Sequence, residues 1–243
     1  MKKLITALLT AMLFAGNVYA AGTLEDGARA YKSGRFTQAI KVLKPLALKG
    51  DAYAQYLLGV TSEKGQGTTQ DYFEAFKWYK LAAEQGNNFA QYSLGVAYLF
   101  GQGVLQDKSE AAKWHKLSAE KGNADAQLSL GFMYDEGDGV KQDDTEAGKW
   151  YKLAAEQGNL FAQYSLGVRY ANGHGETQDY VIAHMWWNLA AAQVHKGLEE
   201  ELVKIPKDAA KYRDSISKKM TPQQIAEAQK LARECLARNY KGC

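Results

Sequence analysis

The stretch GNNFAQYSLGVAYLFGQGVLQDKSEAAKWHKLSAEKGN, residues 86–123, is followed by a second version of the same phrase, GNADAQLSLGFMYDEGDGVKQDDTEAGKWYKLAAEQGN, residues 122–159. Two markers recur 36 residues apart without a slip: Trp78, Trp114, Trp150 and Trp186, and Gly59, Gly95, Gly131 and Gly167. A fixed period of this length indicates a repeat architecture. One repeat buries too few large side chains to offset the ordering of its backbone, so each copy must complete its neighbour's core.

The second half of each repeat predicts an amphipathic helix, which we call helix B. Its apolar stripe has the helical spacing i, i+3, i+4 and i+7, as in Ala147, Trp150, Tyr151 and Ala154. Asp143 precedes the stripe and Glu146 follows three residues later, so we expect a capping box in which the glutamate reaches back to the aspartate backbone. Gly158 is placed to end the helix in a left-handed conformation.

The first half of each repeat predicts another helix, helix A, exemplified by residues 124–136. Gly131 lies in its middle, where glycine costs about 1 kcal/mol relative to alanine. Its return in every repeat indicates that a neighbouring helix passes too close for a side chain. The Gly-x-Gly pairs, such as Gly137 and Gly139, predict turns between the two helices, because they lack the third glycine and the lysine of a phosphate-binding loop.

The pattern A-x-x-x-L-G-x-x-Y-x-x-G-x-G-V, followed by D-x-x-x-A-x-x-W-Y-x-x-A-A-x-x-G, resembles the Sel1-like repeat. The resemblance implies an all-α fold, a right-handed α/α superhelix or solenoid of stacked helix hairpins related to tetratricopeptide arrays. It also implies an adaptor in envelope assembly, signalling or host interaction. We expect four regions: a signal peptide (1–20), a tetratricopeptide-like capping hairpin (21–50), Sel1-like repeats (51–193) and a C-terminal helical cap (194–243).

The N-terminus has the pattern of a secretory signal peptide. Lys2 and Lys3 precede an apolar run over residues 4–15, and small residues surround Tyr19 at the expected cleavage site. The run is shorter than the roughly 20 residues that a transmembrane helix needs. We therefore expect no membrane span and an exported protein, either periplasmic or secreted and host-directed.

The charge and the histidines exclude several classes of partner and cofactor. The formal charge of +3 falls to about +1 without Lys2 and Lys3, which argues against binding to nucleic acid. No histidine belongs to a metal-binding motif, so the sequence predicts no metal and no other cofactor. His115 takes the place of a packed tyrosine and is interpreted as core, whereas His174 is expected in a solvated loop.

The C-terminal region departs from the repeat. Val194 replaces the terminating glycine, so the preceding helix is expected to continue, with a break at Pro206. A last helix is expected to begin after Thr221, with Gln224 completing a capping box. The two cysteines follow the signal sequence, and an oxidising compartment favours their pairing over free thiols or an intermolecular bridge. They are Cys235 and Cys243.

Partner recognition is predicted at helix A positions that differ between repeats. Aromatic side chains dominate two of these sets, and tyrosine combines apolar area with a hydrogen-bonding tip. The candidate partner-binding residues are Tyr53, Tyr56, Phe89, Tyr92, Phe161, Tyr164 and Arg169. The alternative for each ring is packing between adjacent helices. The hypothesis is a non-enzymatic scaffold whose concave groove binds a protein or peptide.

The competing hypothesis is an enzyme. Ser215 and Lys218 match the S-x-x-K motif of β-lactamases and penicillin-binding proteins, and some Sel1-like proteins are linked to β-lactam or peptidoglycan chemistry. The accompanying S-D-N and K-T-G motifs are absent from the sequence. The alternative interpretation of the motif is the basic end of an amphipathic helix.

Overall fold

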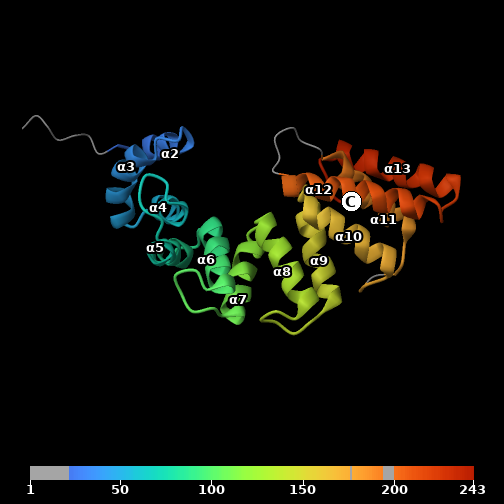
Figure 1. Ribbon diagram of the computed structural model, residues 1–243, viewed down its shortest axis with the longest axis horizontal. Helices are drawn as coiled ribbons and strands as arrows, with labels where there is room; N and C mark the ends of the chain where they lie inside the picture. The colour runs from blue at the N-terminus through green and yellow to red at the C-terminus, as the bar shows by residue number, and fades with distance from the viewer. Residues whose placement is uncertain (1–21, 176, 194–199) are drawn as a thin grey trace, which may run out of the picture. The chain divides into compact units, whose positions relative to one another are not determined.

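The computed structural model describes residues 22–175, 177–193 and 200–243, without the side chains of residues 200–203. These residues form helices and no strand, and consecutive helices pair as hairpins (Figure 1). The predicted all-α class is therefore confirmed. The helices are α2 (Leu24–Lys32), α3 (Phe36–Leu48), α4 (Ala52–Lys64), α5 (Tyr72–Glu84), α6 (Asn88–Phe100), α7 (Lys108–Glu120), α8 (Ala124–Glu136), α9 (Asp144–Ala155), α10 (Leu160–Asn172), α11 (Tyr180–Ala192), α12 (Glu200–Ser217) and α13 (Pro222–Ala237).

Contacts divide the chain into two compact units, one ending at Ala90 and one running from Gln91 to Cys243. In the first unit, α2 packs on α3, α3 on α4, and α4 on α5. In the second unit, each helix from α7 to α11 packs on the next, and α11 contacts both α12 and α13. Predicted signal residues 1–20 lie outside the described residues, and in the part that is described no helix has the length and hydrophobicity needed to cross a membrane.

Each helix B begins at an aspartate cap, but the second half of the predicted capping box is wrong. The Asp143 carboxylate accepts a hydrogen bond from the backbone N–H of Glu146 at 3.0 Å. The backbone N–H of Asp143 instead donates to the carbonyl of Tyr134 in the preceding helix, at 3.0 Å. Because that donor is already used, the Glu146 side chain turns outward and accepts from Lys149 at 2.5 Å.

The recurring helix A glycines make room for an aromatic side chain of the following helix B. A Cβ atom built on Gly131 would lie 2.7 Å from the ring of Tyr151, well inside van der Waals contact. The other glycines face Tyr79, His115 and Trp187 in the same way. We call these four positions the aromatic slot; its members are Tyr79, His115, Tyr151 and Trp187. The predicted close approach is confirmed, and the neighbour is a ring rather than a backbone.

A buried glutamine joins successive repeats. Gln127 in α8 donates to the carbonyl of Ala119 at the end of α7, at 3.0 Å. Its own amide oxygen accepts a hydrogen bond from Gln157, just after α9, at 2.7 Å. Gln163 makes the equivalent pair of bonds in the next repeat, accepting from Gln193. The two-sided amide therefore holds the end of one hairpin against the end of the next, and no polar atom of it is left unpaired.

The C-terminal helices differ in part from the prediction. Helix α11 ends at Ala192 although no glycine follows, because Gln193 caps it and bonds to the carbonyl of Gly158. Helix α12 continues through Pro206, so the predicted break there is wrong. Pro206 is fully buried, and burial of its ring offsets part of the cost of one lost backbone bond. The predicted start of the last helix is confirmed, since Thr221 and Gln224 form both bonds of a capping box.

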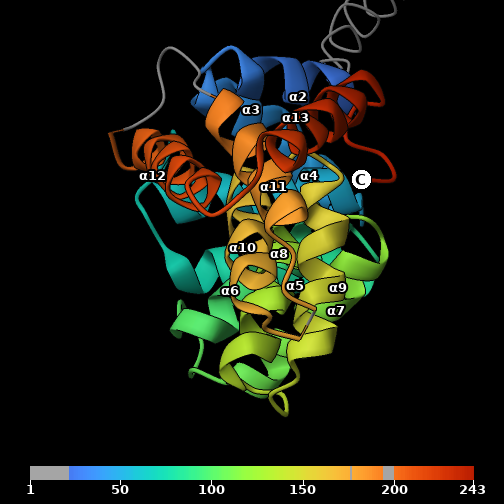
Figure 2. The ribbon, with the colours of Figure 1, turned by 90° about the vertical axis from the view of Figure 1, so that its right-hand side faces the viewer.

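Helix α13 lies against α11, which also contacts α12 (Figure 2). Met185 and Leu189 of α11 are at most 2% exposed and share a cluster with α13. The same positions one repeat earlier hold Lys149, which is exposed, and Leu153, which is 45% exposed. An exposed lysine of the earlier repeat is therefore replaced by a buried methionine where α13 covers α11, and the leucine at the other position becomes buried.

The predicted disulfide is present between Cys235 and Cys243, with Cα atoms 5.5 Å apart. The chain turns back through residues with positive φ, as in Asn239 and Gly242. Cys235 is itself buried in the cluster that α13 shares with α11. The covalent loop therefore closes the end of α13 where that helix packs.

Candidate functional site

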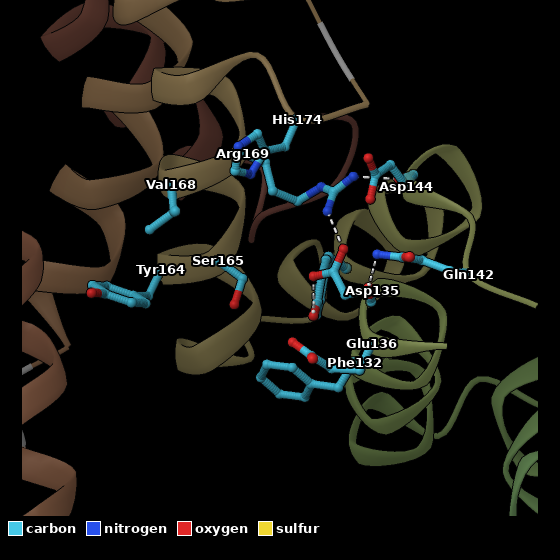
Figure 3. Close-up of a pocket in the computed structure, with 11 residues that line it drawn as sticks. Phe132, Asp135, Glu136, Gln142, Asp144, Tyr164, Ser165, Val168, Arg169 and His174 are labelled. Atoms are coloured by element: carbon cyan, nitrogen blue, oxygen red, sulfur yellow. Dashed lines mark hydrogen bonds and ion pairs between the residues drawn. The ribbon is translucent and has the colours of Figure 1, made fainter. Parts of the chain in front are cut away.

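Arg169 is the centre of a buried polar cluster between α8, α9 and α10. Only 4% of its surface is exposed, although it replaces small or apolar residues of other repeats. One terminal nitrogen donates to the Asp135 carboxylate and the other to the backbone carbonyl of Asp144 (Figure 3). The other Asp135 oxygen accepts a hydrogen bond from the Tyr151 hydroxyl at 2.8 Å. The guanidinium thus connects three helices.

Tyr151 acts in this cluster as a hydrogen-bond donor. Burial, followed by the hydrogen bond to the Asp135 carboxylate, raises its pKa far above the usual range. The phenol therefore keeps its proton at neutral pH, and the carboxylate is the acceptor. Because Asp135 is also paired with Arg169, its charge is neutralised within the protein. This part of the site is a fixed structural support.

A cavity of about 450 Å³ lies beside the cluster. Phe132 and Glu136 line it from α8, and Tyr164 and Val168 line it from α10 (Figure 3). Phe132 is 44% exposed, and its ring packs edge-on against Tyr151 with centroids 5.4 Å apart. The volume falls within the range of ligand pockets, about 300–1,000 Å³. The cavity therefore combines an accessible aromatic surface with a charged rim.

The charged rim is predominantly acidic. Asp135, Glu136 and Asp144 contribute three carboxylates to the lining, against the single guanidinium of Arg169. The carboxylates of Glu136 and Asp144 have no partner within the described part of the chain. Both residues are exposed. Two uncompensated negative charges therefore face the solvent at this cavity.

Four consecutive segments match the model of the Sel1 repeat: residues 52–87, 88–123, 124–159 and 160–195. Together they cover more than half of the chain. The chain belongs to the Sel1 repeat family. No curated protein matches the sequence significantly.

Two solved structures share this Sel1 fold. A Sel1 repeat protein from Oxalobacter formigenes is 26% identical, with a TM-score of 0.67 over 87% of this chain and 99% of that one. The protein c5321, a protective antigen present in uropathogenic Escherichia coli strains, is 29% identical, with a TM-score of 0.68. That match covers 96% of this chain and 56% of the antigen, so this Sel1 protein spans little more than half of its length.

Three of the predicted partner-binding residues come together in the first unit of the Sel1 protein. The ring centroids of Tyr53 and Tyr56 in α4 are 6.0 Å apart. Phe89, at the start of α6, lies 5.8 Å from Tyr56 and is 50% exposed. Both tyrosines also touch the core of their unit and are partly buried. The result is a short aromatic row with one end open to solvent.

The other predicted residues lie in the second unit and are more enclosed. The Tyr92 ring packs 5.4 Å from that of His115. Phe161 is partly buried. Tyr164 packs edge-on against Tyr212 of α12, and burial followed by the charge of Tyr212 raises its pKa to about 12. Tyr164 therefore contributes both to the cavity and to the contact with α12.

The sequence singled out Arg169 as a partner-binding residue, whereas its side chain is buried and bonded within the protein, and the residues around it were not predicted. Asp135 and Phe132 lie on helix A at positions where the repeats differ, which is the signal that drew attention to Arg169. Asp144 lies on helix B, which was treated only as core. The cavity depends on their proximity in space, and spacing along one helix does not reveal it. His174 is exposed, as predicted for a loop residue, yet it also lines the cavity.

The residues of the enzyme hypothesis do not form a recognisable site. Ser215 in α12 and Lys218 just after it are both exposed, and neither lines the cavity. Within the described chain, no hydrogen bond joins the Ser215 hydroxyl to a base, which nucleophilic catalysis by serine requires. Also within those residues, no three His, Cys, Asp or Glu side chains are grouped as a metal site.

Proposed function

We propose that this Sel1 repeat protein is an exported, non-enzymatic scaffold that binds a segment of another protein on its helix A surfaces. The observation that carries the proposal is the aromatic row formed by Tyr53, Tyr56 and Phe89. Aromatic side chains supply much of the binding energy of protein interfaces, because they bury a large area with few rotatable bonds. The half-exposed Phe89 is the accessible end of this row.

Family membership and the disulfide support the other parts of the proposal. Sel1 repeats typically serve as protein-interaction scaffolds. A disulfide persists in an oxidising compartment such as the periplasm or the extracellular space, which agrees with the signal peptide expected from the sequence. The relative from uropathogenic Escherichia coli is described as a protective antigen, which fits a protein displayed or released outside the cytoplasm.

The test is affinity capture followed by a matched pair of variants. The chain from residue 21 onward is immobilised and exposed to envelope extract and to culture medium, and bound proteins are identified by mass spectrometry. Phe89→Ala should weaken the captured complex at least about tenfold, as expected for an interface hot spot. Phe73→Ala is the control, since Phe73 is 59% exposed on α5 and lies outside the row.

Circular dichroism of both variants shows whether the fold is intact. Equal loss of binding in the two variants would show that any exposed aromatic side chain contributes to binding, and that the row is not a specific site. Full binding by Phe89→Ala would overturn the assignment of the row. Absence of any captured protein from both sources would contradict the scaffold function itself.

A further inference from the structure

We infer that the cavity between α8, α9 and α10 receives a lysine or arginine side chain of the partner protein. This inference rests on the proposed function and adds the chemistry of what is bound. The cavity shares no residue with the aromatic row, and every residue that lines it lies in the second unit. The argument depends on which charges of the site are already used and which remain.

The positive charge of the site is consumed internally. Both terminal nitrogens of Arg169 donate within the protein, and the side chain is 4% exposed. The guanidinium is therefore not available to bind an anionic ligand. It neutralises Asp135, which leaves the charges of Glu136 and Asp144 uncompensated at the rim. The charge that complements this site is positive.

The lining also suits the shape of a long basic side chain. The Phe132 side chain is 44% exposed, and an aromatic ring attracts an ammonium or guanidinium group. Tyr164 and Val168 provide apolar surface on the opposite wall, where the methylene stem of lysine or arginine can pack. Carboxylates at the rim then pair with the charged end. An aromatic wall, an apolar wall and free carboxylates match the three parts of such a side chain.

A metal ion fits this site less well. Within the described residues no group of three potential ligands is arranged to hold one, although three carboxylates line the cavity. Asp135 is held away from that role by its bonds to Tyr151 and Arg169. The two remaining carboxylates provide too few ligands for a calcium ion, which takes six to eight oxygens. A partner cation delivered on a flexible stem requires no such coordination shell.

The experiment selects peptides from a random dodecamer library displayed on phage, using the immobilised chain from residue 21 onward. Bound sequences are expected to be enriched in lysine and arginine. The dissociation constant of a selected peptide, measured by calorimetry, should rise at least tenfold in the double variant Glu136→Gln/Asp144→Asn. Phe132→Ala should raise it about fivefold. Replacing the basic residue of the peptide by acetyl-lysine or citrulline should abolish binding.

The matched control is Glu120→Gln/Glu227→Gln, which removes the same net charge from exposed positions on α7 and α13. It should bind the peptide like the unmodified protein. Circular dichroism should show that all variants remain folded, because the carboxylates of Glu136 and Asp144 are exposed and have no partner to lose among the described residues, and the backbone carbonyl of Asp144 that Arg169 contacts is unchanged by the substitution.

Each other outcome overturns the inference. Selected peptides without basic enrichment, or equal binding by the two double variants, would refute the cation site while leaving the scaffold function intact. Competition by free arginine at the same concentration as the peptide would show a small-molecule site instead of a protein-binding one. Absence of any selected peptide, combined with failed capture from extract and medium, would refute the inference and the proposed function together.

Discussion

His115 and Tyr151 occupy the aromatic slot of consecutive repeats, but they differ in whether their polar atoms find hydrogen-bond partners. The Tyr151 hydroxyl donates to Asp135, and Arg169 completes the cluster. His115 is fully buried, and neither ring nitrogen has a hydrogen-bond partner among the described residues. Burial lowers the pKa of His115 from 6.5 to about 4. The polar atom of the Tyr151 ring is hydrogen-bonded, whereas both polar atoms of the His115 ring lack partners and burial disfavours its charged form.

The difference shows that the slot residue and its partner change together within one chain. The carboxylate of Asp135 lies 16 residues before Tyr151, and Glu63 accepts from Tyr79 at the same separation, at 2.5 Å. At the equivalent position before His115 the chain has Leu99, which cannot accept a hydrogen bond. Where the slot holds tyrosine, the chain has an acidic residue 16 positions earlier. Where the slot holds His115, that acidic residue is absent. The repeat conserves the shape of the slot more strictly than its polarity.

The largest expected effect comes from Gly131→Val, which would break the slot that Tyr151 occupies. The added side chain meets the Tyr151 ring, whose hydroxyl is held by Asp135 and cannot shift freely. We expect the free energy of unfolding to fall by about 3 kcal/mol, at the upper end of overpacking effects. Urea unfolding followed by circular dichroism measures it. Lys152→Val on the exposed side of α9 is the control, and an equal loss in both variants would contradict the packing account.

The next effect is an acid-dependent loss of stability through His115. Its pKa in the folded protein lies below the unfolded value, so the unfolded chain binds the proton more tightly. Stability is therefore complete above pH 6.5 and declines as the pH falls from 6.5 toward 4, by about 3 kcal/mol in total. Unfolding midpoints measured between pH 7 and pH 4 should fall more steeply for the unmodified chain than for His115→Phe.

His184 is a second buried histidine that contributes to the acid dependence of stability. It is 3% exposed, and burial, followed by the charge of Arg213, lowers its pKa as well. Some acid dependence should therefore remain in His115→Phe. Identical pH profiles for the two proteins would show that His115 finds a partner in solution and would remove the contrast between the slots.

The smallest expected effect comes from introducing a tyrosine and its carboxylate acceptor at the slot that His115 now occupies. Leu99→Glu combined with His115→Tyr recreates the pair formed by Glu63 and Tyr79. That pair needs no arginine, since the residue equivalent in sequence to Arg169 is Ala97. A double-mutant cycle should give a favourable coupling of about 1 kcal/mol, the value of one hydrogen bond. A coupling of zero would show that geometry, not the missing acid, distinguishes the slots.

The fold was predictable because its determinants are repeated. Gly131 recurs at the same place in every copy, so the close approach of a neighbouring helix could be anticipated from the sequence, although the ring that fills the slot changes from tyrosine to histidine and tryptophan. The C-terminal region carries no such redundancy. Pro206 indicated a break by local rules, but its buried position within α12 overrode them.

The candidate site was predictable only in part, because its members are unique in the chain. Arg169 attracted attention as a departure from its counterparts, but its partners Asp135 and Asp144 could not be assigned to it from the sequence alone. Their association depends on how three helices converge, and the backbone carbonyl of Asp144 has no signature in the sequence at all. Likewise, nothing in the sequence distinguishes the half-exposed Phe132 from a packed ring.

The packing of α13 on α11 also limits where a protein of this kind can gain repeats during evolution. A duplicated repeat inserted before residue 160 could form, with both neighbours, the same glutamine hydrogen bonds that join the existing repeats. A copy added after α11 would have to displace the disulfide-closed helix and leave Met185 and Trp186 facing water. New copies are therefore expected to arise in the interior of the gene, with the ending inherited unchanged.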